Sequence, residues 1–382
     1  MALLRCRAGF AVLAALLAAT GCGPGGDDSP AVVVTTTRPD TTSTAPTSTT
    51  TSPVVTTAPA QPATGACPSV PARAAPLPDR PRYRLRVGVR PAENLVDGDL
   101  TVRFTPDVET DRLVFRLWPN SPRTAAAGAR LEVAGVDVGG RPATTSLTGP
   151  TTLEVLTGRL APGRAVEVAA RWRLTLPGEV NDRVSRSGDA VRLGSFFPLL
   201  AWEPGVGWAT DPPTSAFAEA TSSPAADFDV RIDVPPGLQV LSTGTPAGPG
   251  RWTAGAVPDF GISVGRFTTA TATAHAPLPV QVTVGVAAGT GESPGRYLSR
   301  VVQALEDFSR RYGAYPWPSY SLAVTPGLSG GIEYPMHVFQ GPGTAGRTTP
   351  HEVAHMWFYG LVATNQGATP WIDEGLATYA EG

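Results

Sequence analysis

From Arg82 onward, apolar side chains alternate strictly with arginines. Tyr83, Leu85 and Val87 fall on one face of an extended chain, because successive side chains of a strand point to opposite faces. The pattern predicts a half-buried antiparallel strand. The same period returns further along the chain, at residues 100–104, 113–117, 166–176, 228–234 and 280–286.

Turn-forming residues are abundant between these segments. The chain of 382 residues contains 42 Gly and 40 Pro, well above the usual share of roughly 12% for the two together. Short strands separated by frequent turns are typical of a sandwich. We therefore predict a β-sandwich-like N-terminal domain over residues 78–268. Within it, Trp202-Glu203-Pro204 is interpreted as a loop that either packs in the core or borders a cleft.

The first residues of the chain have the pattern of an export signal. Arg5 and Arg7 precede an apolar run of 13 residues that ends at Thr20, which is too short to span a bilayer permanently. Residues 1–21 are therefore predicted to be a signal peptide. The end of the run, Ala19-Thr20-Gly21-Cys22, resembles a bacterial lipoprotein signal, in which Cys22 carries the lipid anchor.

Residues 22–77 are predicted to be a disordered stalk. Between residues 35 and 57, 12 of 23 residues are Thr, and such a composition buries too little apolar surface to offset the entropy of ordering. Signal and stalk together predict an exported, extracytoplasmic protein that is lipid-anchored to the bacterial cell membrane. The alternative is a secreted protein with a disulfide between Cys22 and Cys67.

Charge and cysteine content exclude two classes of protein. The formal net charge is −2, so a basic surface that binds nucleic acid is not expected. Three Cys do not make a disulfide scaffold. Nothing in the sequence indicates an oligomeric state.

A change of period marks a second domain, predicted for residues 269–382. Apolar residues within 296–312 are spaced three or four apart, as on the buried face of a helix. A short strand is predicted at residues 320–324. Thr349 and Pro350 predict the start of another helix, as its N-cap and its first residue.

That helix carries the sequence His351-Glu352-Val353-Ala354-His355. Residues four apart share one face of a helix, so the two imidazoles can bind one zinc ion. Glu352 comes directly after the first of them, where its carboxylate can act as general base toward a water molecule. Two of the four His of the chain fall in this register.

Glu374 is the candidate third ligand. Eighteen residues separate it from His355, and the segment 371–379 around it is predicted to form a second helix that brings its carboxylate to the metal. Two His, one Glu and an open fourth position are typical of a catalytic zinc site.

Structural alternatives stay open for the two acids. Thr349 and Glu352 have the spacing of a capping box, in which Glu352 serves only the end of the helix. Glu374 is alternatively a solvated acid at the start of a helix. Tyr379 is predicted to pack in the core, and His337 is predicted to be an ordinary surface residue.

These motifs resemble the gluzincin zinc aminopeptidase family, which includes alanyl aminopeptidase. The resemblance rests on the HEXXH motif, the gap of eighteen residues, and Glu374 followed by Gly-Leu-Ala-Thr-Tyr. Upstream, Gly330-Gly331-Ile332-Glu333 is similar to the Gly-Ala-Met-Glu-Asn strand of the family, with Tyr334 in place of the Asn. The resemblance implies a multidomain fold, in which the β domain is followed by a thermolysin-like α/β catalytic domain.

The resemblance also implies roles for residues of the strand. Glu333, with Gly330 and Gly331, is expected to bind the free N-terminus of a peptide; otherwise Glu333 is an ordinary acid at an exposed sheet edge. Family members continue into further helices, which supply a Tyr that stabilises the oxyanion. The catalytic domain is therefore expected to be incomplete after the third zinc ligand.

The function expected from these residues is zinc-dependent hydrolysis of peptide bonds. Zinc would be held by His351, His355 and Glu374, with Glu352 as the catalytic residue, and peptides at the cell surface would lose N-terminal residues. One alternative is a zinc endopeptidase with the same groups. The other is a lipid-anchored protein that binds peptides and cleaves none.

Overall fold

The computed structural model describes residues 79–213, 222–362 and 365–382. These residues all belong to one of the two units of the chain, Pro68–Gly382. The predicted signal peptide, the predicted stalk and Cys22 lie outside the described residues. Within the described ranges, no helix has both the length and the apolarity needed to span a membrane.

The alternation that begins at Arg82 produces strand β1 (Arg82–Arg90), in which Tyr83, Leu85 and Val87 are buried and the arginines between them are exposed. The strand pairs antiparallel with β2 but parallel with β14, so the predicted antiparallel pairing holds on one of its edges. It belongs to an eight-stranded sheet, whose strands in spatial order are β16 (Thr245–Pro246), β17 (Arg251–Val257), β14 (Ala226–Asp233), β1, β2 (Leu95–Phe104), β8 (Val166–Thr175), β4 (Arg130–Val138) and β5 (Arg141–Pro142).

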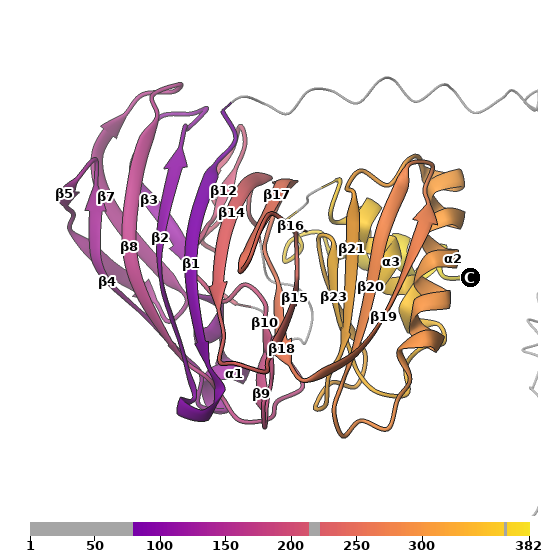
Figure 1. Cartoon of the computed structure of the whole chain (residues 1–382). Helices are drawn as coiled ribbons and strands as arrows, with labels where there is room; N and C mark the ends of the chain where they lie inside the picture. The colour runs from indigo at the N-terminus through magenta and orange to yellow at the C-terminus, as the bar shows by residue number, and fades with distance from the viewer. Residues whose placement is uncertain (1–78, 214–221, 363–364) are drawn as a thin grey trace, which may run out of the picture. The chain divides into compact units, whose positions relative to one another are not determined.

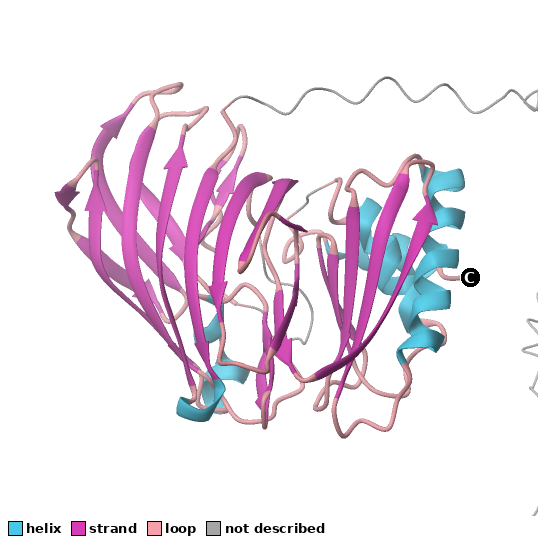
Figure 2. Ribbon diagram, in the orientation of Figure 1, coloured by secondary structure: helices cyan, strands magenta, loops and turns pink. Residues whose placement is uncertain are grey.

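A second sheet shares its core with the first. Leu113, Phe115 and Val155 belong to the same buried cluster as Leu85, as expected where two sheets pack face to face. This sheet contains β11 (Leu199–Leu200), β3 (Thr110–Arg116), β7 (Thr152–Leu160) and β6 (Thr145–Gly149). A third sheet contains β15 (Gln239–Ser242), β18 (Ile262–Gly265), β10 (Ala190–Leu193) and β9 (Val184–Ser187), and β12 (Trp202–Glu203) pairs with β13 (Gly207–Trp208). Figure 2 shows how strongly strands dominate this part of the chain.

From Phe267 onward the chain forms a separate five-stranded sheet with helices against it (Figure 1). Helix α2 (Pro294–Tyr312) buries Val301, Leu305 and Phe308 and contacts two strands of the sheet, which confirms the helical period. In spatial order the strands are β19 (Phe267–His275), β20 (Pro279–Ala287), β21 (Ser319–Val324), β23 (His337–Gln340) and β22 (Gly331–Tyr334). The remaining helices are α1 (Pro122–Ala126), α3 (Thr348–Phe358), α4 (Leu376–Ala380) and the short helices η1 (Pro91–Glu93), η2 (Trp118–Asn120) and η3 (Trp371–Gly375).

Helix α3 begins at Thr348, two residues before the predicted first residue Pro350, and its N-cap is Arg347. The hydroxyl of Thr349 is buried, and it hydrogen-bonds to Oε1 of Gln340 at 3.2 Å. Thr349 is therefore not the N-cap: it lies inside the helix, and its hydroxyl hydrogen-bonds to the side chain of Gln340 on β23. The alternative of a capping box with Glu352 is wrong.

A buried arginine joins the five-stranded sheet to the strand-rich region, by which we mean the strands β1 to β18 between Arg82 and Gly265. The guanidinium of Arg192 donates hydrogen bonds to Oγ1 of Thr325 at 3.0 Å and to the carbonyl oxygens of Gly327 and Val180 at 3.1 and 2.8 Å. Burial lowers the pKa of Arg192 to about 10, so the group keeps its charge at neutral pH. These bonds hold the loop after β21 against β10.

Two predictions about single residues are wrong. His337 is fully buried on β23, an inner strand of its sheet, and its ring nitrogens hydrogen-bond to Ser321 at 2.7 Å and Ser263 at 2.9 Å. Tyr379 is 78% exposed. The small residues Ala377 and Ala380 occupy the buried face of α4 instead, and the helical period alone does not show which face is buried.

Candidate metal centre

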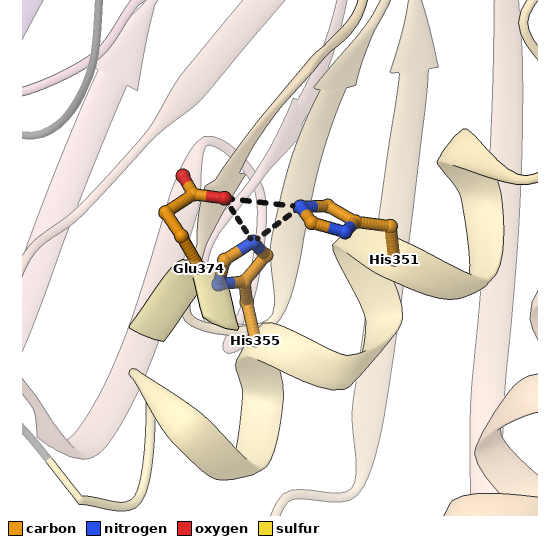
Figure 3. Close-up of side chains that lie close together, drawn as sticks. All are labelled: His351, His355 and Glu374. Atoms are coloured by element: carbon orange, nitrogen blue, oxygen red, sulfur yellow. Dashed lines mark hydrogen bonds and ion pairs between the residues drawn. The ribbon is translucent and has the colours of Figure 1, made fainter. Parts of the chain in front are cut away.

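Three donor atoms meet beside helix α3 (Figure 3). His351 and His355 lie one turn apart on α3, and Glu374 comes from η3. The Nε2 atoms of the two histidines are 3.1 Å apart. Oε2 of Glu374 lies 3.2 Å from Nε2 of His351 and 3.9 Å from Nε2 of His355. The structure thus brings the three predicted ligands together.

The spacing of the three donors fits a tetrahedral zinc site. Bonds of about 2.0–2.2 Å from zinc to nitrogen or oxygen place ligand atoms about 3.3–3.6 Å apart in a tetrahedron. The three distances between the donor atoms bracket this range. Two imidazole nitrogens and one carboxylate oxygen are also the donor set of catalytic zinc, which keeps a fourth position for another ligand.

Each histidine turns its other ring nitrogen toward a carboxylate. Nδ1 of His355 hydrogen-bonds to Oδ1 of Asp373, and Nδ1 of His351 lies 3.3 Å from Oε2 of Glu381. Such contacts favour a proton on Nδ1 and leave the lone pair of Nε2 for a metal. Neither Asp373 nor Glu381 was predicted from the sequence. Asp373 could have been predicted, because it comes directly before the candidate ligand Glu374. No sequence pattern indicates a role for Glu381.

Carboxylates dominate the electrostatics of this centre. Burial by itself lowers the pKa of His355, but Glu333, Asp373 and Glu352 outweigh burial and raise the pKa well above its usual range. The pKa of His351 is raised as well, because the hydrogen bond to Glu374 and nearby negative charge outweigh burial. A site that stabilises positive charge on its imidazoles also favours a bound dication.

Glu352 lies beside the ligands rather than at the end of the helix. It is buried on α3, and its carboxylate contacts β22 so closely that a Cβ atom added to Gly331 would stand 2.2 Å from Oε1. One ligand atom each of Glu352, Glu333 and His355 lies within 4.8 Å of the other two. The predicted base and the predicted anchor therefore lie close to a predicted metal ligand.

Glu333 is buried although β22 is an edge strand. Its exposed fraction is 5%, so the alternative of an ordinary acid at an exposed edge is wrong. Oε1 of Glu333 accepts a hydrogen bond of 3.1 Å from the amide of Gln366. Of the two predicted glycines, Gly331 packs against Glu352, whereas a Cβ atom at Gly330 would meet nothing within 4 Å.

Tyr334 ties β22 to the strand-rich region. Its ring is buried in a slot left by two glycines, since added Cβ atoms at Gly194 and Gly261 would lie 2.0 and 2.7 Å from ring or hydroxyl atoms of Tyr334. Its hydroxyl lies 3.3 Å from Oγ of Ser195, which donates to Asp259 at 2.6 Å. Burial raises the pKa of Asp259 to about 6. The residue after Glu333 is thus fixed by packing.

The segment around Trp202 is not the predicted loop, because Trp202 and Glu203 form strand β12 and pair with β13. Trp202 is buried, and it also lines a cavity of about 570 Å³ together with Phe104 and Glu203. Asn365 lines the same cavity, and its side-chain amide donates a hydrogen bond to Oε1 of Glu203. The cavity therefore borders the chain segment that leads to Gln366.

No family model matches the chain. Among solved structures, the M1 zinc metallopeptidase from Deinococcus radiodurans superimposes with a TM-score of 0.59 at 23% sequence identity, over 79% of this chain and 69% of that chain. This chain has the fold of an M1 zinc metallopeptidase.

Two further M1 structures show the same likeness. A mutant of the Deinococcus radiodurans protein, bound to a Tyr-Ser-Ala substrate, has a TM-score of 0.59 at 23% identity, over 79% of this chain and 69% of that chain. A two-domain M1 zinc metallopeptidase mutant bound to L-arginine has a TM-score of 0.57 at 24% identity, with the same coverage. The similarity concerns the fold, and the candidate metal ligands are assigned from the distances between their donor atoms in this chain.

Proposed function

We propose that this chain is a zinc-dependent aminopeptidase, which removes N-terminal residues from peptides. The observation that carries the proposal is the convergence of Nε2 of His351, Nε2 of His355 and Oε2 of Glu374 on one point. The M1 fold supports the same class. In this account residues 78–268 are a β-sandwich-like domain, and residues 269–382 belong to a thermolysin-like α/β catalytic domain.

The residues around this point divide the chemistry between them. Zinc, when bound, supplies a Lewis acid that polarises a carbonyl group and lowers the pKa of water toward about 7. The carboxylate of Glu352 takes a proton from the attacking water and delivers it to the nitrogen of the leaving amine. Glu352 is buried, and electrostatic interactions of its carboxylate with the water and with the leaving amine are stronger there because the local dielectric constant is low.

Glu333 favours removal of single residues over internal cleavage. Its carboxylate would pair with the free ammonium group of a peptide. Because Glu333 lies within 4.8 Å of the ligand His355, a peptide held in this way presents its first peptide bond to the metal. A blocked N-terminus would lose this ion pair.

The test is release of the N-terminal residue from a panel of unblocked peptides and their N-acetylated forms, with zinc and with a chelator. Chelator-sensitive release from unblocked peptides, restored by zinc, is the expected result. Equal cleavage of blocked peptides would indicate an endopeptidase. Peptide binding with zinc present and no cleavage would indicate a binding protein, and either result would contradict the proposal.

We further propose that the protein is exported and held on the outer face of the bacterial membrane by lipid on Cys22. The basic residues, the apolar run and the Ala-Thr-Gly-Cys end of that run support this location. The test is the membrane fraction of cells that express the chain or its Cys22→Ala variant, after labelling with a radioactive fatty acid. Label and membrane association are expected in the first and not in the second.

A further inference from the structure

Gln366 connects two carboxylates that come from different elements. It is 1% exposed. Its Nε2 donates to Oε1 of Glu333 on β22 at 3.1 Å and to Oδ2 of Asp373 on η3 at 2.6 Å. An amide nitrogen carries two hydrogens, so one group satisfies both acceptors. Gln366 lies in the gap between His355 and Glu374, where the motif specifies no residue.

The bridge extends to the candidate metal centre. The other oxygen of Asp373 hydrogen-bonds to Nδ1 of His355. A continuous path of hydrogen bonds therefore runs from Glu333 through Gln366 and Asp373 to His355. This path links the group that would hold the substrate ammonium to a group that would hold the metal.

The chemistry of the bridge suits a neutral donor. Asp373 is fully buried and Glu333 nearly so, and two such carboxylates repel each other in a medium of low dielectric constant. An amide hydrogen-bonds to both carboxylates without adding charge beside them. A carboxylate at residue 366 would lack the two donor hydrogens, and an ammonium group would offset a negative charge that Glu333 needs for its ligand.

The backbone around Gln366 is anchored on its N-terminal side. The side-chain amide of Asn365 donates to Glu203 of β12, and its Oδ1 accepts the N–H of Ala368 at 3.0 Å. The backbone oxygen of Asn365 accepts the N–H of Thr369 at 2.9 Å. Gln366 is therefore presented by a closed turn, which limits the positions that its amide can adopt.

We propose that Gln366 is a positioning residue, which holds the carboxylate of Glu333 at the place where it captures the ammonium group of a peptide. The inference rests on the proposed aminopeptidase function and assigns a determinant of its preference for a free N-terminus. Gln366 acts through Glu333 and contacts no reacting atom. Its loss should weaken recognition of the N-terminus and leave the metal in place.

The experiment measures binding rather than turnover. The full chain carrying Glu352→Gln is loaded with zinc, and its dissociation constants for trialanine and N-acetyl-trialanine are measured by calorimetry. The dissociation constant for N-acetyl-trialanine divided by that for trialanine reports the preference for a free N-terminus. Gln366→Glu and Gln366→Met are introduced into this background, with Gln303→Glu on the exposed surface of α2 as the matched control.

We expect both substitutions at Gln366 to lower this ratio about tenfold, as loss of a hydrogen bond to a charged group would. Zinc content should stay at that of the parent, and Gln303→Glu should change neither quantity. An unchanged ratio would contradict the proposal. Loss of zinc in parallel with the ratio would also contradict it, since Gln366 would then act on the metal through Asp373.

Two further outcomes are distinguishable from these. A parent chain that binds both peptides equally would refute the aminopeptidase function itself, and with it the role of Gln366. If Gln366→Glu lowers the melting temperature so far that binding cannot be measured, Gln366→Met decides, because it keeps the shape of the side chain and adds no charge.

Discussion

The side chain of Glu352 occupies the space that a Cβ atom on Gly331 would need. The added atom would lie 2.2 Å from Oε1 and 2.5 Å from Cγ of Glu352. The absence of a side chain at the start of β22 thus lets the carboxylate of α3 lie directly on the strand. A glycine at this place is a condition for the position of the proposed base.

Replacement of this glycine should therefore impair catalysis more than folding. In Gly331→Ala the new methyl group displaces the carboxylate of Glu352, and we expect kcat to fall about 100-fold or more, with zinc retained. The matched control is Gly346→Ala, because a Cβ atom there would meet nothing within 4 Å. Full activity of Gly331→Ala would contradict the role of Glu352 as the base.

Zinc affinity should depend on the carboxylate behind His355. Asp373→Ala removes the partner of Nδ1, and we expect zinc to bind about 10–100-fold more weakly, as measured by competition with a chromophoric chelator. His355→Ala should abolish binding in the same assay. Asp111→Ala on the exposed surface is the control. Wild-type affinity in Asp373→Ala would show that this carboxylate does not support the ligand.

Stability should fall in acid because of His337, which lies outside the metal centre. Burial lowers the pKa of His337 to about 3, whereas an unfolded chain has a His pKa of about 6.5. Between these values the unfolded state binds the proton and the folded state does not, so stability is lost as the pH falls through this window. Asp259 acts oppositely, since its raised pKa favours the folded state in acid.

A substitution isolates the contribution of His337. We expect wild type to lose about 2–3 kcal/mol more than His337→Gln between pH 7 and pH 4.5. Urea unfolding of both proteins at the two pH values measures this difference. Equal losses would show that His337 does not titrate on unfolding.

The sequence predicts the parts of the fold that repeat a period. The alternation around Tyr83 defines β1, and the spacing of Val301 and Leu305 defines α2, because each pattern follows from the geometry of its element. The parallel pairing of β1 with β14 could not be predicted, since β14 lies far along the chain. Alternation shows which face of a strand is buried, but it does not show which strands lie beside it. The outward position of Tyr379 also depends on which face its neighbours bury.

The site likewise contains residues that the sequence predicts and residues that it does not. His351, His355 and Glu374 follow from a spacing that helix geometry makes meaningful, and the structure brings them together. Gln366 and Glu381 lie outside any motif, and their contacts arise from the path of the chain around the ligands. The slot for Tyr334 needs two glycines of the strand-rich region, and no local pattern connects them to Glu333.

The most direct test of the account compares wild type with Glu352→Gln, measuring zinc content and release of the N-terminal residue from the same unblocked peptide. We predict equal zinc content in both proteins and a loss of N-terminal residue release of about 100-fold or more in the variant. Release at the wild-type rate by Glu352→Gln, or a wild-type chain that binds no zinc, would contradict it.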